Sequence, residues 1–166
     1  MRVLLAAAAL AGLVSLPLAG HAELITYTES VVASGSLAGR PFTNAVVTIT
    51  GSADTSQVEP SFAGYAVLTS GARVTVAGVG TFTFNDPIQF FVSPMFDVAG
   101  VSDLTGPLGL DIVDTQNSAF ETYSLITAFG PVTGPPVVNA GDPFSTSGGA
   151  LVLNSAGDST FTATEP

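Results

Sequence analysis

The sequence predicts an all-β protein whose strands form an antiparallel β-sandwich. Thr, Val, Phe, Gly and Ser dominate residues 23–166, whereas the helix-forming residues Lys, Gln and Glu are scarce there. Apolar and polar residues alternate in several short stretches, which is the period of a strand with one buried face. Turn-forming Gly, Pro, Asn and Asp recur between these stretches about every 8–12 residues. Together these features predict a sandwich of the jelly-roll or immunoglobulin-like kind behind a helical N-terminal signal peptide.

The segment 1–22 has the features of a cleavable signal peptide. Arg2 gives it a positive start, residues 3–16 are apolar, and Gly20 and Ala22 place small side chains where a signal peptidase reads them. A transmembrane anchor is the alternative, but the apolar run is shorter than the roughly 20 residues that a spanning helix needs. We therefore expect an exported chain, extracellular or at the cell surface, with one domain over 23–166 and no transmembrane segment in it.

Period-two alternation marks the expected strands in the first half of the domain, beginning with LITYTESVVA. Gly78 separates two alternating stretches that read as a hairpin with a short turn. The sequence Asn-Asp-Pro at 85–87 ends this hairpin, because Asn and Asp favour turns and Pro cannot donate to a ladder. The strands expected here are 24–33, 45–50, 62–69, 73–77, 79–84, 88–92 and 95–98.

Turns and prolines divide the second half in the same way. The stretches LGLDIV and AFETYSLIT read as a pair of strands, and the Pro-rich segment 130–136 interrupts pairing. The sequence Asn-Ser-Ala-Gly at 154–157 reads as the turn of a last hairpin. The strands expected here are 108–113, 119–127, 150–153 and 159–164. The phenylalanines expected in the core are Phe82, Phe84, Phe90, Phe91 and Phe96.

The charge of the domain excludes several classes of function. Without the segment 1–22, two arginines and no Lys stand against 13 acidic residues, which gives a net charge of −11. Nucleic acids need clustered Lys and Arg, so no nucleic-acid partner is expected. The chain has no Cys, and its single His lies at position 21. Thiol chemistry, catalytic triads with His, and zinc sites with Cys or His ligands are therefore excluded for the domain.

Five stretches carry a resemblance to a known family: TYTESVVASGSLAG (26–39), FTNAVVTITGSADT (42–55), VTVAGVGTFTFNDP (74–87), LGLDIVDTQNSAF (108–120) and LNSAGDSTFTATEP (153–166). They resemble exported proteobacterial proteins of the PEP-CTERM type, which an exosortase sorts to the surface. In that family a Pro-Glu-Pro motif precedes an apolar helix and a basic cluster, whereas this sequence ends at Thr-Glu-Pro. The resemblance implies export and an association with exopolysaccharide and biofilm, and it transfers no catalytic residue.

A set of oxygen-bearing side chains forms a candidate calcium site. Asp111, Asp114 and Asn117 lie close together in the sequence, and Asp103 completes the set. Calcium takes about six to eight hard oxygen ligands, which carboxylates and amides supply. The spacing does not match an EF-hand loop. The alternative is that these are solvated carboxylates at strand ends, which discourage edge pairing. No other cofactor is expected.

Carboxylates also provide the groups for glycoside hydrolysis, which needs two of them about 5–10 Å apart in a cleft. No motif selects a pair, and the chain has no Trp to form a sugar platform. We therefore expect no enzyme activity and no catalytic residue. The carboxylates considered for this chemistry are Asp97, Asp103, Asp111, Asp114 and Glu121.

Thr-x-Thr recurs along the expected strands, at 26–28, 48–50, 81–83 and 160–164. Such alternation places hydroxyls and methyls on one face, as in ice-binding or sugar-binding sheets. The high strand propensity of Thr explains the same pattern. Three tyrosines, Tyr27, Tyr65 and Tyr123, present the same choice between stacking on sugars and packing in the core.

The sequence thus predicts a non-enzymatic, secreted or cell-surface protein with a structural or adhesive role. Its expected partners are exopolysaccharide or other components of the cell envelope. A glycan- or calcium-binding module is one alternative, and a carboxylate-based hydrolase is another.

Overall fold

The computed structural model describes residues 22–61, 63–105 and 110–166, so most of the expected signal peptide lies outside the described residues. In the first half of the chain the strands are β1 (Leu24–Leu37), β2 (Arg40–Asp54), β3 (Glu59–Ser61), β4 (Gly64–Leu68), β5 (Ser70–Val76), β6 (Gly80–Thr83) and β7 (Ile88–Ser93). In the second half they are β8 (Val98–Asp103), β9 (Leu110–Gln116), β10 (Phe129–Gly134), β11 (Pro136–Val137), β12 (Pro143–Thr146) and β13 (Gly149–Thr164).

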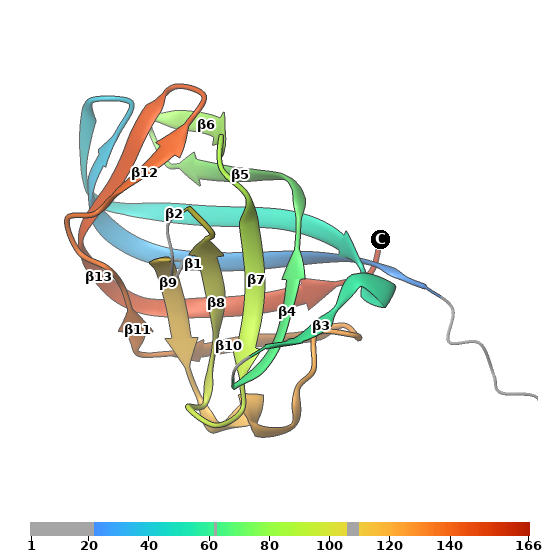
Figure 1. The fold of residues 1–166 in the computed structure, drawn as a ribbon. Helices are drawn as coiled ribbons and strands as arrows, with labels where there is room; N and C mark the ends of the chain where they lie inside the picture. Colours follow the sequence, from blue (N-terminus) through green and yellow to red (C-terminus); the bar gives the residue numbers. More distant parts are fainter. Residues whose placement is uncertain (1–21, 62, 106–109) are drawn as a thin grey trace, which may run out of the picture.

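The strands form two antiparallel sheets that pack face to face (Figure 1). The seven-stranded sheet has the order β10-β13-β1-β2-β5-β6, and β12 pairs with β13 beside this path. The six-stranded sheet has the order β11-β9-β8-β7-β4-β3. Figure 1 shows the long strands β1, β2 and β13 running across the direction of β7, β8 and β9. This crossing is the orthogonal kind of sheet packing. The predicted all-β antiparallel sandwich is confirmed.

Alternation along each strand explains why the sheets pack on one face. In β1 every second residue from Ile25 to Val31 is buried, and the residues between them are partly exposed. An aromatic cluster fills the centre of the core. The Tyr27 ring of one sheet stacks on Phe90 of the other with centroids 5.5 Å apart, and Phe161 meets Phe90 edge to face. Offset and edge contacts of this kind add to the stabilisation from burial.

At one end of the seven-stranded sheet, the segment after β6 pairs with β12 and partly closes the sheet on itself. Phe84, which follows β6, forms an isolated antiparallel bridge with Thr146 at the end of β12. Backbone hydrogen bonds from Asn85 N to Ser145 O and from Ser147 N to Thr83 O join the same two segments. Because β12 also pairs with β13, the last strand of the path, β6, is linked back to its second strand.

The remaining outer strands of both sheets contain proline. Pro60 lies in β3, Pro131 in β10 and Pro136 in β11. Proline has no N–H to donate, so it is confined to edge strands and bulges in sheets. Three of the four outer positions in the two strand orders therefore carry a residue that weakens further pairing, and the fourth, β6, is bridged to β12.

Four sequence predictions are wrong. The strand expected over 95–98 is a turn as far as Asp97, because Phe96 N donates to Ser93 O and Asp97 has a φ of 56°. The Pro-rich segment 130–136 does not interrupt pairing, because Pro131 and Pro136 lie in the edge strands β10 and β11, which pair on one side only.

The other two errors concern 119–127 and 154–157. Residues 119–127 do not form a strand, because the Asn117 side chain accepts a hydrogen bond from Ala119 N and starts the 3₁₀ helix η2 (Ser118–Thr122). Residues 154–157 are not a turn, because β13 continues through them with shifts in its register against β1. One extra residue of β13 is absorbed as a bulge between the pairs Val31–Ser159 and Ala33–Ala156, where Gly157 and Asp158 stand against Val32.

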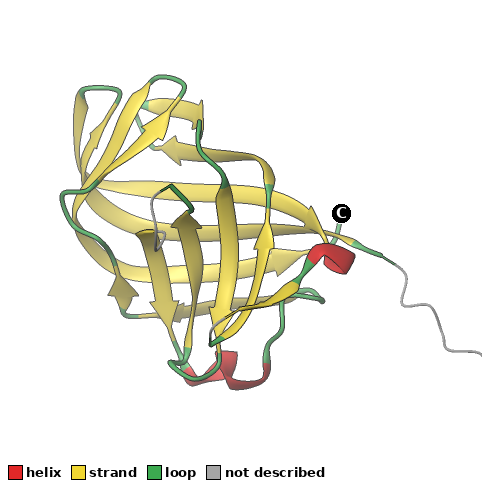
Figure 2. Cartoon of the chain, viewed as in Figure 1, coloured by secondary structure: helices red, strands yellow, loops and turns green. Residues whose placement is uncertain are grey.

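The other helical segment is the 3₁₀ helix η1 (Thr55–Gln57), which together with η2 appears in red in Figure 2. Within the described ranges, neither the length nor the apolar character of any helix is sufficient to cross a membrane.

Candidate functional site

The structure separates the four candidate calcium ligands. Asp111 and Asp114 come to the outer face of the six-stranded sheet, where they stand opposite Ser102 and Gly100 of β8. A bulge at Ile112 makes this possible, since residues three apart in a regular strand point to opposite faces. Sequence reasoning placed Asp111 and Asp114 together but had no means of finding the bulge that puts them on one face.

The other two candidate ligands serve local structure. Asp103 Oδ1 accepts hydrogen bonds from Thr105 N at 2.7 Å and Thr105 Oγ1 at 2.6 Å. Asn117 caps η2 and donates its Nδ2 to Thr133 O at 3.0 Å. Asn117 lies six positions after Asp111 in the sequence. At the usual rise of about 3.3 Å per residue in a strand, this is a distance of roughly 20 Å. In the described part of the chain, no three Asp, Glu, His or Cys residues gather in an arrangement that would hold a metal ion.

The five carboxylates considered for hydrolysis are also dispersed. Asp97 lies in the turn between β7 and β8, where its φ is 56°, and Glu121 is an exposed residue of η2. Asp103 is buried and bonded to Thr105. Only Asp111 and Asp114 are neighbours, and none of the three surface depressions described below is lined by either of them.

A buried acidic residue that sequence reasoning missed lies in the core. Glu29 of β1 is fully buried, and its Oε1 lies 2.6 Å from Thr115 Oγ1 of β9. Thr115 Oγ1 lies 2.7 Å from Ser159 Oγ of β13, and Ser159 Oγ donates to Asp114 O at 3.0 Å. The chain of contacts joins the two sheets. Its one sequence signal is an acidic residue at an inward position of an otherwise apolar alternation, TYTESVV.

Burial and hydrogen bonding act in opposite directions on the Glu29 carboxyl. Thr115 Oγ1 donates to Glu29 Oε1, and Ser159 Oγ donates to Asp114 O. Burial outweighs the hydrogen bonds that Glu29 accepts from Thr115 and Ser159, and it raises the pKa of Glu29 to about 8. The uncharged form of the Glu29 carboxyl is therefore favoured at neutral pH.

Asp114 is a second buried acid, on the outer face of the six-stranded sheet. Burial, followed by the neighbouring carboxyls of Asp111 and Glu29, raises the pKa of Asp114 to about 9. Its Oδ1 and the Oε2 of Glu29 are both buried without a hydrogen-bond partner. The Asp114 carboxyl lies where a side chain on Gly100 would begin, since a Cβ there would be 2.2 Å from Oδ1. Glu29 is fully buried and Asp114 is 3% exposed, so neither acid offers a surface to a substrate.

The outer face of the seven-stranded sheet carries an ordered array of hydroxyls. The central row crosses all six strands of the path in register: Thr133, Thr160, Ser30, Thr48, Thr75 and Thr81. Within it the hydroxyls pair across strands at 2.8 Å (Thr133–Thr160), 3.4 Å (Ser30–Thr48) and 2.8 Å (Thr75–Thr81). The next row is Thr162, Thr28, Thr50, Arg73 and Thr83, and the third is Thr164, Thr26, Ser52 and Ser70.

These three rows, called the hydroxyl face below, contain no carboxylate, although the whole chain has 13 acidic residues. Their one charged side chain is Arg73. Neighbouring strands lie about 4.8 Å apart and same-face residues about 6.7 Å apart along a strand, so the array repeats in two directions. A shallow hollow of about 320 Å³ lies on this face, lined by Thr26, Thr50, Gly51, Ser52, Ser70, Gly71 and Arg73.

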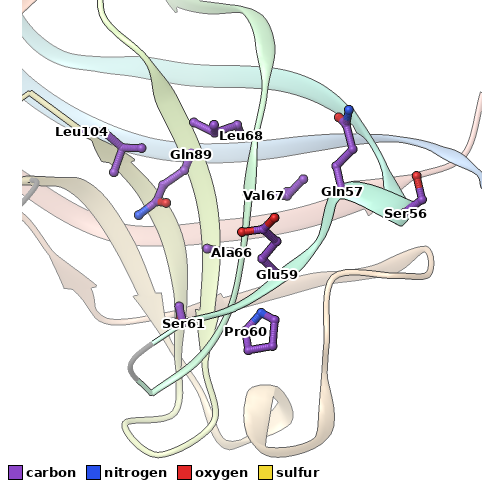
Figure 3. Close-up of a pocket in the computed structure, with 10 residues that line it drawn as sticks. All are labelled: Ser56, Gln57, Glu59, Pro60, Ser61, Ala66, Val67, Leu68, Gln89 and Leu104. Atoms are coloured by element: carbon purple, nitrogen blue, oxygen red, sulfur yellow. The ribbon is translucent and has the colours of Figure 1, made fainter.

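A larger groove lies at the other sheet (Figure 3). It encloses about 610 Å³ and is lined by Ser56, Gln57, Glu59, Pro60, Ser61, Ala66, Val67, Leu68, Gln89 and Leu104. Figure 3 shows the Glu59 carboxyl reaching from β3 over the β4 strand, with Leu68 and Leu104 forming an apolar end. Gln89 Nε2 donates to Ser102 Oγ at 3.0 Å, which fixes its amide at the wall. The lining contains one carboxylate and no cation.

A third depression connects the groove with the hydroxyl face. It has a volume of about 390 Å³ and shares Gln57 and Leu68 with the groove. It shares Ser52 and Ser70 with the hollow on the hydroxyl face. The three depressions therefore follow one another around the margin of the sandwich, and we call them the track.

Two of the three tyrosines are part of the core. Tyr27 is fully buried, with its hydroxyl donating to Leu125 O at 2.6 Å, and Tyr123 stacks on Phe129 with centroids 4.1 Å apart. Tyr65 is 38% exposed. Among the expected core phenylalanines Phe84 and Phe90 are buried, Phe82 and Phe91 are half-buried, and Phe96 is exposed.

Comparisons of the chain with protein-family models, with curated proteins and with solved structures found no match.

Proposed function

We propose that this chain is a non-catalytic, exported β-sandwich that adheres to polysaccharide outside the cell through its hydroxyl face. The observation that carries the proposal is the register of that face, where 14 hydroxyl-bearing side chains and Arg73 form three rows. The signal-peptide features of segment 1–22 and the resemblance to exported surface proteins support the location.

The chemistry of the face favours a polyhydroxylated ligand without anionic groups. Ser and Thr hydroxyls both donate and accept hydrogen bonds, as sugar hydroxyls do. An array that repeats in two directions suits a ligand that itself repeats. The domain carries a net charge of −11, which repels polyanions. The rows hold no carboxylate whose desolvation would oppose the binding of a neutral chain.

The placement of the acidic residues supports a role without catalysis. The two carboxyls with strongly raised pKa values, Glu29 and Asp114, are sealed from solvent. A general acid must reach the bond that it protonates, and these two do not border any of the three depressions of the track.

Co-sedimentation with insoluble neutral glucan and with chitin tests the proposal. The double variant Thr48→Val, Thr75→Val keeps side-chain shape and strand propensity but removes two hydroxyls from the central row. We expect its affinity to fall at least about fivefold, since each lost hydrogen bond is worth about 0.5–1.5 kcal/mol. The matched control is Thr43→Val, an exposed residue of β2 outside the three rows.

Two results would contradict the proposal. One is equal binding by the double variant and the Thr43→Val control. The other is thermal hysteresis of ice growth that the double variant loses, with no polysaccharide binding by the parent protein. Ice also presents a repeating array of hydroxyls, and this outcome would make it the ligand in place of a glycan.

A further inference from the structure

We infer that a single linear glycan occupies the whole track, and that protonated amino sugars are selected where it passes Asp54 and Glu59. This inference rests on the proposed function, because one end of the track lies on the hydroxyl face. It adds a second binding region, the groove of Figure 3, and a preference for sugars that carry an amine.

The three depressions of the track are continuous with one another. The hollow at Arg73, the connecting depression and the groove share lining residues in sequence, Ser52 and Ser70 for the first pair and Gln57 and Leu68 for the second. Their volumes are about 320, 390 and 610 Å³, which lie within the range of about 300–1,000 Å³ that is typical of ligand sites. A flexible polymer is the ligand class that can follow such a path.

The charge of the lining side chains changes sign along the track. The hydroxyl-face end holds Arg73 and no carboxylate, the connecting depression holds Asp54, and the groove holds Glu59. Asp54 Oδ1 accepts from Ser56 N at 2.8 Å, so this carboxyl is held in place at the start of η1. Charge on the track therefore changes from positive to negative, and the negative part fits a protonated amine.

The groove fits a sugar ring by its mixture of groups. Leu68 and Leu104 offer apolar surface to the C–H face of a ring, while Gln57, Gln89 and Ser61 offer amides and a hydroxyl to its polar edge. Glu59 is exposed and reaches over β4, where a carboxylate can accept from an ammonium group. Charge-assisted hydrogen bonds of this kind are roughly twice as strong as neutral ones.

Isothermal titration calorimetry with soluble oligomers of glucosamine and of N-acetylglucosamine, in short and long forms, tests the inference. At equal length the glucosamine oligomer should bind more tightly, and raised salt should reduce this difference. Glu59→Gln should weaken glucosamine binding about two- to fivefold, as the loss of an exposed ion pair does, and leave N-acetylglucosamine binding unchanged. The matched control, Glu121→Gln, removes an exposed carboxylate from η2 and should change neither.

Chain length separates this inference from the proposed function. The variant Thr48→Val, Thr75→Val should weaken long oligomers and spare short ones, which fit within the groove. Suppose that Glu59→Gln binds glucosamine oligomers as tightly as Glu121→Gln does, while the variant Thr48→Val, Thr75→Val still loses binding to insoluble glucan. This result would contradict the inference that a glycan follows the track, and it would leave the proposed function of the hydroxyl face supported. If long oligomers bind no better than short ones, no single chain spans the track, and the inference fails.

Discussion

The Thr115 hydroxyl lies 2.6 Å from the Glu29 carboxyl, and this contact joins β9 of one sheet to β1 of the other inside the core. Both residues are fully buried. The series continues through Ser159 to Asp114 O, and burial raises the pKa of Glu29 to about 8, which favours its neutral form. The core of this sandwich is thus held by a polar connection as well as by aromatic packing.

The first prediction concerns pH. The folded state keeps a proton on Glu29 up to a pKa of about 8, whereas the ordinary carboxyl value is 4.5, so folding binds a proton between these limits. Stability therefore falls as pH rises through this window, by up to roughly 1.4 kcal/mol per pH unit for each such group. Asp114, with a pKa of about 9, acts in the same direction. Denaturant unfolding at several pH values measures the slope.

Glu29→Gln isolates the share of Glu29 in that slope. Gln is always neutral, and its amide oxygen can accept from Thr115 as the Glu29 carboxyl does. We expect the variant to fold and to show a smaller loss of stability between about pH 5 and pH 8 than the parent protein. Glu121→Gln is the control and should keep the parent slope. An unchanged slope in Glu29→Gln would contradict the assignment of the proton.

The second prediction concerns Thr115. Thr115→Val removes the hydroxyl that donates to Glu29 Oε1 at 2.6 Å and leaves a buried carboxyl short of one hydrogen bond, which costs about 1–3 kcal/mol. Combining it with Glu29→Leu should cost less than the sum of the two single changes, because both groups of the contact are then apolar. A double-mutant cycle in urea measures this coupling, and strict additivity would show that the contact carries no energy.

The third prediction concerns Gly100, which lies beneath the Asp114 carboxyl. A Cβ at this position would be 2.2 Å from Asp114 Oδ1 and 2.6 Å from Val113 O. Gly100→Ala should therefore lower stability by about 1–3 kcal/mol, as overpacking does. At Gly157 the nearest atom to a Cβ is Val32 O at 3.6 Å, an ordinary contact, so Gly157→Ala should have little effect. Melting temperatures of the two variants compare them directly, and equal values would contradict the crowding.

The fourth prediction concerns calcium. The four candidate ligands lie on different faces and at both ends of β9, and two of them are bonded to neighbouring backbone. We expect millimolar calcium, the concentration that weak extracellular sites need, to leave the melting temperature unchanged. A rise that Asp111→Asn abolishes would show that Asp111 and Asp114 hold a cation after all.

The fold was predictable where one periodicity dominates and less so where a local bond or a bulge competes with it. The alternation around Tyr27 and Val47 gave β1 and β2 directly, although both strands extend beyond the predicted ends. The error at 119–127 arose because one Asn cap outweighs alternation over a few residues. The error at 154–157 arose because turn-forming residues also occur in bulges, which pairing with β1 stabilises.

The candidate sites depended more on register than on composition. Thr-x-Thr in single strands was visible in the sequence, but the row from Thr133 to Thr81 exists only because six strands align. The groove at Glu59 joins residues from η1 to Leu104, which no local pattern connects. The sequence around Glu29 does not show that this residue is part of a buried polar cluster. The cluster forms only because the fold brings Thr115 of β9 and Ser159 of β13 close to Glu29.

The prolines in β3, β10 and β11 and the bridge from Phe84 to Thr146 have a consequence for crowded surroundings. A sheet that offers no regular row of unpaired backbone groups is a poor template for another copy of itself. Molecules at high local concentration can then remain separate and refold independently, instead of growing into cross-β fibrils. Contacts with other molecules are left to the broad faces of the sandwich.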